Sequence, residues 1–226
     1  MKLAIMQPYF LPYIGYWQLL ANANKFVVYD NIEYTKKGWI NRNRYCEDEY
    51  FTVPLQKASD FEPICHRLLA KTWPQERGKI LRKIRSFYRR SPNFNFVYPI
   101  IEDIFLCPDI DLFDFIFSSI IKVRNYLAIT TPIIISSSID LSGDLRGKER
   151  VVETCKKATS HAAIIYVNPI GGTNLYKKED FEKHDIELRF LKTKEKGENC
   201  LSIIDLMFRF YREELIDKVN NFEEIS

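Results

Sequence analysis

The sequence predicts an α/β fold with three layers around a mostly parallel sheet, and three observations lead to it. The first thirty residues contain a short apolar run, then a segment with helical spacing, then a second apolar run, which is the order of a βαβ unit. Strand and helix patterns alternate again after residue 132. Residues 70–128 show helical spacing and no strand pattern. We therefore expect one Rossmann-like domain over residues 1–226, resembling nucleotidyltransferase-type folds, with a helical insertion at about 70–128.

The N-terminal unit predicts where a ligand binds. Lys2–Met6 has the length of one buried strand, and Ile14–Ala23 has helical spacing. A second apolar run, Phe26–Tyr29, ends at Asp30. Ligands of parallel sheets bind where the first strand ends and the next helix begins. The crevice expected there is bordered by Asp30 and by five residues of the loop and helix start: Gln7, Tyr9, Pro12, Gly15 and Tyr16.

The remaining elements follow from the same patterns. A β-hairpin is expected within residues 39–55. Asp111 and Ser202 are expected as helix N-caps, and Asp205 as the acidic residue of a capping-box-like start. The polar tail from Lys218 is expected to fray. Further strands are expected at 132–135, 163–167 and 186–191, and helices within 73–127 and near 148–158, 178–184 and 202–211.

The composition narrows the class of protein. The chain has 226 residues, 46% of them hydrophobic, so a large core is available. Its net charge of +3 is near balance and argues neither for nor against nucleic acid. We expect no DNA partner. The five cysteines are scattered without a CxxC pair, which is typical of reduced thiols and not of a disulfide framework or a zinc site. No stretch approaches the roughly 18 apolar residues of a membrane span. We expect a cytoplasmic protein.

The start of the first helix occupies the place of a known nucleotide-binding signature. Tyr13-Ile-Gly-Tyr16 stands where nucleotidyltransferases and adenylate-forming ligases have H-x-G-H, whose imidazoles hold the ATP phosphates. Tyrosines can donate hydrogen bonds but carry no positive charge. Two interpretations stay open at this point. Gly15 admits a base or phosphate to the backbone, or the aromatic helix start only packs for stability.

A basic stretch follows Asp30. Cationic and amide side chains that alternate along a hairpin can clamp phosphates, and arginine does so with two hydrogen bonds. A solvated basic edge is the alternative. The stretch consists of Lys36, Lys37, Arg42 and Arg44, interleaved with Trp39, Asn41 and Asn43.

Two other strand ends and one helix carry further candidates. Ser136–Ser138 supplies hydroxyls, and the paired glycines of Asn168–Gly172 allow a close approach of backbone to a ligand. Because three strand ends carry polar or glycine-rich loops, we expect a shared cleft. The helix within 77–90 is basic on most of its circumference, which indicates a solvated face or contact with acidic lipid or RNA. No pair of histidines has metal spacing.

The motifs together resemble the WbqC-like protein family. The match runs through almost the whole chain, and one segment, Lys192–Asn199, departs from it by being lysine-rich. The family occurs in gene clusters for bacterial O-antigen and related surface sugars, and a glycine transferase is the activity suggested for some members. The matching residues are Met6–Tyr16, Tyr29-Asp30, Lys36–Arg44, Ser136–Ser138, Tyr166, Gly171-Gly172, Tyr176 and Leu201–Asp205.

The resemblance and the residues together predict an activity. We expect transfer of a small acyl or aminoacyl group, glycyl first, to a nucleotide-linked sugar, through an acyl-adenylate made from ATP with Mg²⁺ and without a tightly bound cofactor. A thioester- or tRNA-dependent acyltransferase and a non-catalytic nucleotide-sugar binding protein are the alternatives. Asp30, Lys36 and Lys37 are the catalytic candidates, with Asp30 as the Mg²⁺ ligand. The binding candidates are Gln7, Tyr9, Pro12, Gly15, Tyr16, Trp39, Asn41, Arg42, Asn43, Ser137, Ser138, Gly171, Gly172 and Tyr176.

Overall fold

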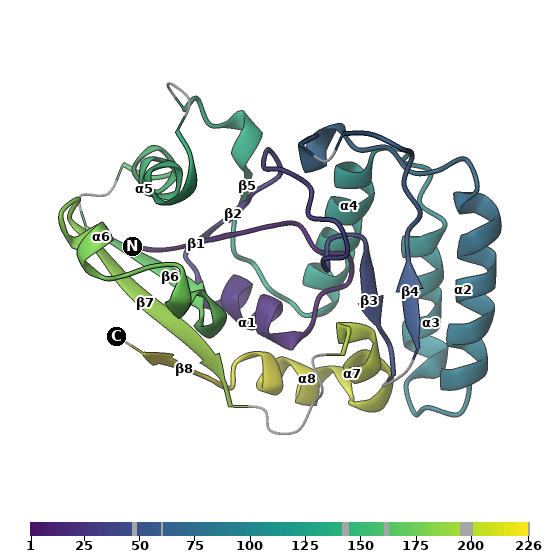
Figure 1. The fold of residues 1–226 in the computed structure, drawn as a ribbon. Coiled ribbons are helices and arrows are strands. Elements are labelled where there is room, and N and C mark those ends of the chain that lie inside the picture. Colours follow the sequence, from purple (N-terminus) through teal and green to yellow (C-terminus); the bar gives the residue numbers. More distant parts are fainter. Residues whose placement is uncertain (47–48, 60, 142–144, 161–162, 195–200, 226) are drawn as a thin grey trace.

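A six-stranded sheet forms one half of the structure, a computed structural model that describes residues 1–46, 49–59, 61–141, 145–160, 163–194 and 201–225 (Figure 1). Its strands are β1 (Lys2–Met6), β2 (Lys25–Val28), β5 (Ile133–Ile135), β6 (Ile164–Pro169), β7 (Ile186–Thr193) and β8 (Phe222–Ile225). They lie in the order β5-β2-β1-β6-β7-β8, and every pair is parallel except the antiparallel pair of β7 and β8. The predicted α/β class and mostly parallel sheet are confirmed.

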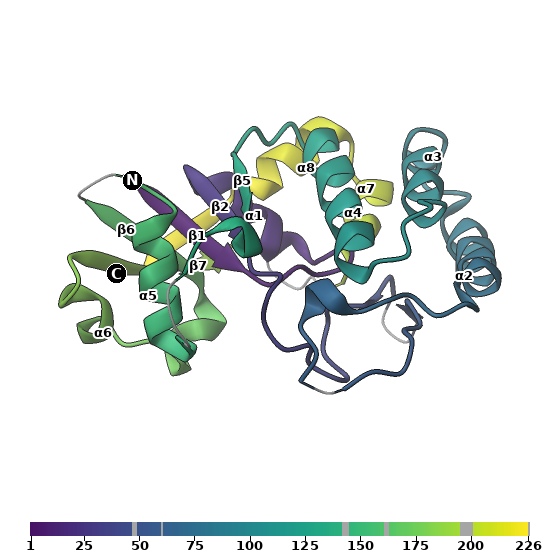
Figure 2. The same cartoon turned by 90° about the horizontal axis from the view of Figure 1, so that it is seen from above.

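Helices cover both faces of the sheet. Residues of one strand alternate between the two faces, so Ala4 belongs to one core cluster while its neighbours Leu3 and Ile5 belong to the other. Figure 2 shows the resulting three layers, with helices on both sides of the sheet. α1 (Ile14–Asn22) and α8 (Arg212–Val219) lie on one side, and α5 (Gly147–Lys157) and α6 (Glu179–Glu182) lie on the other.

The segment between β2 and β5 forms the other half of the molecule. It holds the helices α2 (Trp73–Tyr88), α3 (Phe94–Phe105) and α4 (Leu112–Tyr126), as the helical spacing predicts. α4 lies next to the sheet, and α2 and α3 lie farthest from it (Figures 1 and 2). The predicted hairpin is present as the antiparallel strands β3 (Arg42–Arg44) and β4 (Tyr50–Thr52).

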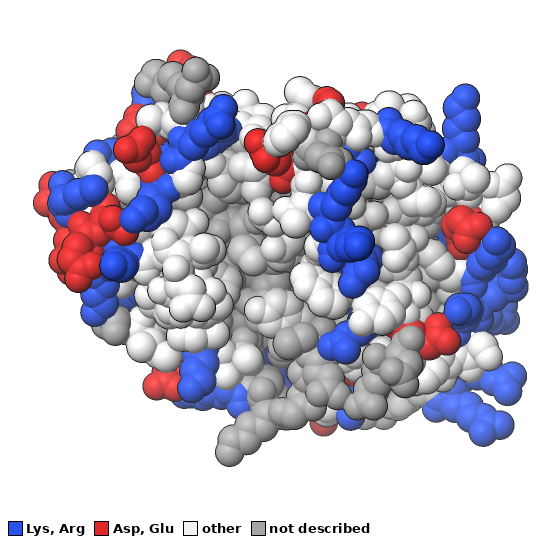
Figure 3. All heavy atoms as spheres, viewed as in Figure 1, with Lys and Arg blue, Asp and Glu red and all other residues white. Residues whose placement is uncertain are grey.

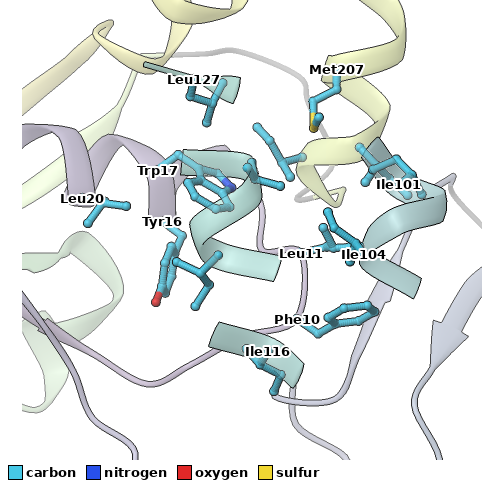
Figure 4. Close-up of a cluster of buried hydrophobic side chains, with 14 of the residues drawn as sticks. Phe10, Leu11, Tyr16, Trp17, Leu20, Ile101, Ile104, Ile116, Leu127 and Met207 are labelled. Carbon is cyan, nitrogen blue, oxygen red and sulfur yellow. The ribbon is translucent and has the colours of Figure 1, made fainter. Parts of the chain in front are cut away.

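One hydrophobic cluster joins the two halves. Phe10, in the loop after β1, is fully buried, and its ring lies 5.4 Å from that of Phe105 and 4.9 Å from that of Phe115. Figure 4 shows Phe10 and Leu11 among side chains of the insertion and of α7 (Ile203–Arg209). The loop that borders the predicted crevice is therefore anchored by burial on its far side.

Two predicted helix starts differ in detail. Ser202 is the N-cap of α7, as predicted, and its side chain accepts a hydrogen bond from the Ile204 amide. Asp111 occupies the N-cap position of α4 without a side-chain capping bond. Asp205 forms no capping box, because its carboxylate instead accepts a hydrogen bond from Tyr88 and pairs with Arg209.

The prediction that the polar tail from Lys218 frays is wrong. β8 follows α8 and pairs with β7, from Phe222 opposite Thr193 to Ile225 opposite Phe190. Glu224 in β8 forms ion pairs with Lys2 and Arg189, so the tail is held at the edge of the sheet. Phe222-Glu-Glu-Ile225 does not alternate between apolar and polar residues, so no local pattern marks this strand.

Three observations concern the cysteines, the hydrophobic segments and the lysine-rich segment. Cys46, Cys65, Cys107 and Cys155 form no disulfide, and Cys200 lies outside the described residues. No helix within the described ranges is long and apolar enough to cross a membrane. Most of the lysine-rich segment 192–199 also lies outside the described residues.

Candidate functional site

The carboxyl ends of β1 and β6 mark the point where the chain changes direction across the sheet. β1 pairs with β2 on one side and with β6 on the other. The chain reaches β2 through α1 and reaches β6 through α5, and these helices lie on opposite faces. The connections therefore diverge between β1 and β6, and ligands of open α/β sheets bind at such a switch point.

A cavity of about 450 Å³ opens at this place. None of the described residues that line it is charged. They come from the ends of β1 and β6, from the segment after β2, from the start of α1, from α5, from Trp39 before the hairpin, and from the turn η3 (Ile170–Asn174) and the two residues after it. Its polar and aromatic lining is formed by Gln7, Tyr9, Tyr13, Tyr29, Trp39, Tyr166, Asn168 and Tyr176.

The tyrosines of the cavity are neutral hydroxyls. Burial raises the pKa of Tyr9 to about 12, and the nearby Tyr13 adds to the shift. Burial also raises the pKa of Tyr29 to about 12, although the Arg150 guanidinium opposes the shift. Desolvation disfavours the phenolate, so these groups donate and accept hydrogen bonds and do not act as bases near neutral pH.

Asn168 fixes the shape of the cavity wall. Its Nδ2 donates to the Tyr166 hydroxyl at 2.7 Å, and both side chains are buried. A Cβ on Gly172 would lie 2.6 Å from Asn168 Oδ1, so glycine is needed there for the close approach. A Cβ on Gly171 would meet nothing within 4 Å. Both glycines line the cavity, as predicted for this turn.

A basic groove adjoins the uncharged cavity. A second cavity of about 510 Å³ shares Tyr29 and Ile32 with the first. Its charged lining consists of Arg146 and Arg150 near the start of α5 and of one acidic residue, Glu33. The Arg150 guanidinium lies 5.4 Å from the centre of the Tyr29 ring. It donates to the Asn31 carbonyl at 3.4 Å, while its buried Nε has no hydrogen-bond partner among the described residues. A cation is therefore held beside the tyrosine wall.

Ser137 and Ser138 lie beside this groove. They line a third cavity of about 380 Å³, which Arg150 and Asn31 also border. Ser136–Ser138 forms the short turn η2 at the end of β5, so the predicted third strand end does reach the same edge of the sheet. The three cavities thus follow one another along that edge.

Asp30 supports the backbone beneath the site. It is 1% exposed and does not line the cavity. Its Oδ1 accepts hydrogen bonds from Ser136 Oγ at 3.1 Å and from the Ser137 amide at 2.9 Å, which ties the end of β2 to η2. Within the described part of the chain no three His, Cys, Asp or Glu residues gather as a metal site. A buried carboxylate whose Oδ1 already accepts two hydrogen bonds does not fit the needs of Mg²⁺.

The helix start of Tyr13–Tyr16 is closed to a nucleotide. A Cβ on Gly15 would lie 2.5 Å from the Tyr13 ring, so the space that the glycine leaves is filled by that ring. Tyr16 is 1% exposed, and its hydroxyl is buried without a partner in the described structure. Only Tyr13 of this motif reaches the cavity. The residues therefore do not fit ATP phosphates at this turn.

The basic stretch divides into two parts. Lys36 and Lys37 are exposed and do not line the cavity. The Arg42 guanidinium lies 5.3 Å from the ring centres of both Trp39 and Tyr50. Figure 3 shows uncharged surface hollowed in the middle of this face and basic side chains over the hairpin beside it. Trp39 is thus the link between the hairpin and the cavity.

Three other binding candidates form hydrogen bonds within the fold. Asn41 accepts from the Tyr34 hydroxyl and donates to the Val53 carbonyl, and Asn43 donates to the Leu11 carbonyl. The Pro12 carbonyl accepts from Trp17 Nε1 and from the Ile203 amide. All three lie outside the cavity, so their role toward a ligand stays a prediction.

The structure thus brings part of the predicted site together and adds to it. The predicted residues Gln7, Tyr9, Trp39, Gly171, Gly172 and Tyr176 share one cavity. Sequence reasoning missed Tyr29, Asn168 and Arg150 as site residues. Tyr29 and Asn168 end parallel strands, which is a signal that could have found them. Nothing in the sequence singles out Arg150 from the other cations of its helix.

One family model matches most of the chain. The model of the WbqC-like protein family matches residues 7–216. An uncharacterized protein, Rv1507c of Mycobacterium tuberculosis, is 40% identical over 63 residues, which are 26% of this chain and 27% of that protein. The chain therefore aligns with about a quarter of this curated relative. No solved structure matches significantly.

Proposed function

Because the chain belongs to the WbqC-like protein family, we propose that it transfers a small acyl or aminoacyl group, glycyl first, to a nucleotide-linked sugar in surface-polysaccharide biosynthesis. One observation supports the part of this proposal that concerns the acceptor, the nucleotide-linked sugar. An uncharged cavity lined by tyrosines lies next to a groove that presents Arg150. A nucleotide-linked sugar has the same division, since an uncharged sugar is joined to an anionic diphosphate.

The cavity suits a sugar in size and chemistry. Its volume of about 450 Å³ lies within the common range of small-molecule sites. Neutral hydroxyls of Tyr9, Tyr29 and Tyr176 and the amide of Gln7 can donate to and accept from sugar hydroxyls. Trp39 and Tyr13 supply apolar ring surface for the sugar faces. The diphosphate would reach Arg150, whose planar guanidinium can bind two phosphate oxygens at once.

The absence of a base within the described lining favours an amine as the acceptor. A sugar hydroxyl must lose its proton during attack, and the cavity offers no carboxylate, imidazole or lysine to take it. A neutral amine attacks without prior loss of a proton. Catalysis would then rest on holding the amine against an activated carbonyl, a contribution of up to roughly 7–11 kcal/mol in favourable cases. Asp30 acts in this scheme as a positioning residue, through η2.

The donor is an acyl group that has already been activated. The helix start does not fit ATP phosphates and Asp30 does not fit Mg²⁺, so the proposed transfer uses neither ATP nor Mg²⁺. A thioester and an aminoacyl-tRNA both bring an activated carbonyl with them. The adenylate route stays a prediction with a direct test: only that route exchanges labelled pyrophosphate into ATP in the presence of glycine before any sugar is added.

The proposal is tested by forming the product. The chain is incubated with UDP- or dTDP-linked amino sugars and, in separate reactions, glycyl-CoA, glycyl-tRNA or glycine with ATP and Mg²⁺. Mass spectrometry should find the sugar nucleotide enlarged by one glycyl group with one donor class. The matched sugar nucleotide with a hydroxyl in place of the amine should stay unchanged. If every donor fails although the sugar nucleotide binds, the protein is a binding protein of the pathway and the transfer proposal is wrong.

A further inference from the structure

The helix α2 presents an excess of cations to solvent. Residues 73–90 contain seven Lys and Arg and a single acidic residue, Glu76. Arg82, Arg89 and Arg90 are exposed, and none has an acidic partner within the described ranges. The side of Figure 3 where Figure 1 places α2 shows more basic than acidic surface. Exposed charges without partners contribute little to stability, so the fold does not explain them.

Aromatic side chains stand exposed among these cations. Phe87 on α2 is 55% exposed, and Trp39 and Tyr50 of the hairpin are 43% and 44% exposed. The Trp39 and Tyr50 rings stack with centres 6.5 Å apart, and the Arg42 guanidinium lies against both. Large exposed rings beside cations are characteristic of surfaces that stack nucleic-acid bases.

The two groups form one surface that leads to the cavity. The Phe87 ring contacts the ring of Tyr45, which follows β3, at 5.8 Å. Lys83 on α2 pairs with Glu49, the neighbour of Tyr50, at 3.0 Å. Trp39 at the other end lines the cavity. We call the set Arg82, Phe87, Arg89, Arg90, Tyr50, Arg42 and Trp39 the basic–aromatic surface.

We propose that the basic–aromatic surface binds RNA, and that this RNA is the aminoacyl-tRNA which donates the acyl group. The proposal rests on the proposed function, since the cavity at the end of the surface is the site of acyl transfer. Phosphates would contact Arg82, Arg89 and Arg90, and unpaired bases near the 3′ end would stack on Tyr50 and Phe87. The aminoacyl ester would then lie at the cavity mouth.

The transfer needs no further reactant. The amine of the bound sugar attacks the carbonyl carbon of the aminoacyl ester. A bond from nitrogen to carbon forms, and the bond from that carbon to the ribose oxygen of the tRNA breaks. The proton lost by the nitrogen ends on the released ribose hydroxyl.

The packing of α2 argues against an anionic membrane as the partner. A helix that lies in a lipid interface turns an apolar face outward. The apolar side of α2, with Leu81, Ile84 and Tyr88, is instead buried in the protein. The charged side with one ring among its cations faces solvent, which suits a phosphate backbone with unpaired bases better than lipid.

The test measures binding of bulk deacylated tRNA by fluorescence anisotropy over a series of salt concentrations. The triple change Arg82→Gln, Arg89→Gln and Arg90→Gln should weaken binding roughly tenfold or more and make the plot of log affinity against log salt shallower by about 2–3. The matched control removes three exposed cations on α5 and near α6, Lys157→Gln, Lys178→Gln and Lys183→Gln, with the same change in net charge. The control should bind as the wild type does.

Three outcomes would overturn the proposal: no tRNA binding at low salt, equal loss in both triple variants, or stronger binding to phosphatidylglycerol vesicles than to tRNA. Tyr50→Leu and Phe87→Leu test the stacking part and should weaken binding without changing the salt slope. The proposed function is tested separately, because the triple variant of Arg82, Arg89 and Arg90 should still bind a UDP-linked amino sugar as tightly as the wild type does. If tRNA binding fails while transfer from a thioester succeeds, the surface proposal is wrong and the function stands.

Discussion

Asn168 connects the core of the sheet to the cavity and illustrates how single residues set the site. Its amide is committed to the Tyr166 hydroxyl, and its Oδ1 faces the Cα of Gly172 so closely that a Cβ would collide with it. Gly171, one residue earlier, has open space. Two adjacent glycines that look alike in the sequence therefore differ in what they do, and only the packing around them reveals the difference.

The two glycines provide a matched pair of substitutions. Gly172→Ala should lower the free energy of unfolding by about 1–3 kcal/mol, because the new methyl group displaces Asn168 and its buried hydrogen bond. Gly171→Ala should change it by less than about 0.5 kcal/mol. Urea unfolding followed by circular dichroism measures both. Equal effects of the two substitutions would contradict this description of the cavity wall.

The buried tyrosines predict a loss of stability in alkali. The pKa of Tyr9 and of Tyr29 is about 12 in the folded chain, above the ordinary value near 10. The folded chain then keeps its phenolic protons where the unfolded chain has lost them. The contribution is fully present below pH 10 and is lost as the pH rises to about 12. Binding at the cavity should not change with tyrosine ionisation between about pH 6 and 9.

Unfolding by urea at a series of pH values checks this. Tyr9→Phe should flatten the decline in stability between pH 10 and 12, and tyrosinate absorbance should show the missing late-titrating group. A decline that is the same in the variant and the wild type would show that Tyr9 is not held neutral by burial.

At the scale of elements, α7 connects parts of the chain that are far apart in sequence. The Ser202 hydroxyl donates to the Leu11 carbonyl at 2.7 Å, and the Ser202 amide donates to the Arg44 carbonyl. Leu11 has a φ of 48°, a left-handed conformation that a leucine holds only when its surroundings enforce it. Asn43 donates to the same carbonyl. The closing motif therefore fixes the loop that leads from β1 to α1.

Ser202→Ala should cost about 1–2 kcal/mol of unfolding free energy, because it removes an N-cap and a buried hydrogen bond. It should also weaken ligand binding, since the strained loop carries Tyr9 and Tyr13 to the cavity. Ser86→Ala on the exposed side of α2 is the matched control and should be neutral or slightly stabilising. If both variants unfold at the same urea concentration, α7 does not anchor the loop.

The elements that sequence reasoning found and missed differ for a physical reason. Apolar runs such as Lys2–Met6 and Phe26–Tyr29 gave the parallel sheet, because burial on both faces leaves a strong pattern. β8 was missed, since an edge strand of charged residues depends on long-range ion pairs such as Lys2 with Glu224. Asp205 has the spacing of a capping residue, but Tyr88 and Arg209 compete for its carboxylate, and neither contact is visible locally.

At the scale of the whole molecule, the order of the strands determines where a ligand binds. The crevice was predicted at the end of β1, between the loop that follows it and Asp30, and the structure places a cavity at the end of β1 that Asp30 does not line. The other half of the cavity, β6 and η3, could be grouped with it only through the shared sheet edge. The basic groove at Arg150 depends on how α5 crosses the sheet, which no local pattern reveals. One half of the candidate site could therefore be predicted from local sequence, and the other half depends on the order of the strands and on how the helices cross the sheet.

The central claim is that the uncharged cavity and the adjoining arginine together bind a nucleotide-linked amino sugar. Isothermal titration calorimetry of the wild type, Gly171→Trp and Arg150→Gln, each with a UDP- or dTDP-linked amino sugar, with the nucleoside diphosphate and with the free sugar, tests it most directly. We predict that the wild type binds the linked sugar at least about tenfold more tightly than either part, a difference of roughly 1.4 kcal/mol. Gly171→Trp should lose the preference for the sugar, and Arg150→Gln should lose affinity for the diphosphate, while both stay folded. Wild-type affinity in both folded variants would contradict the account.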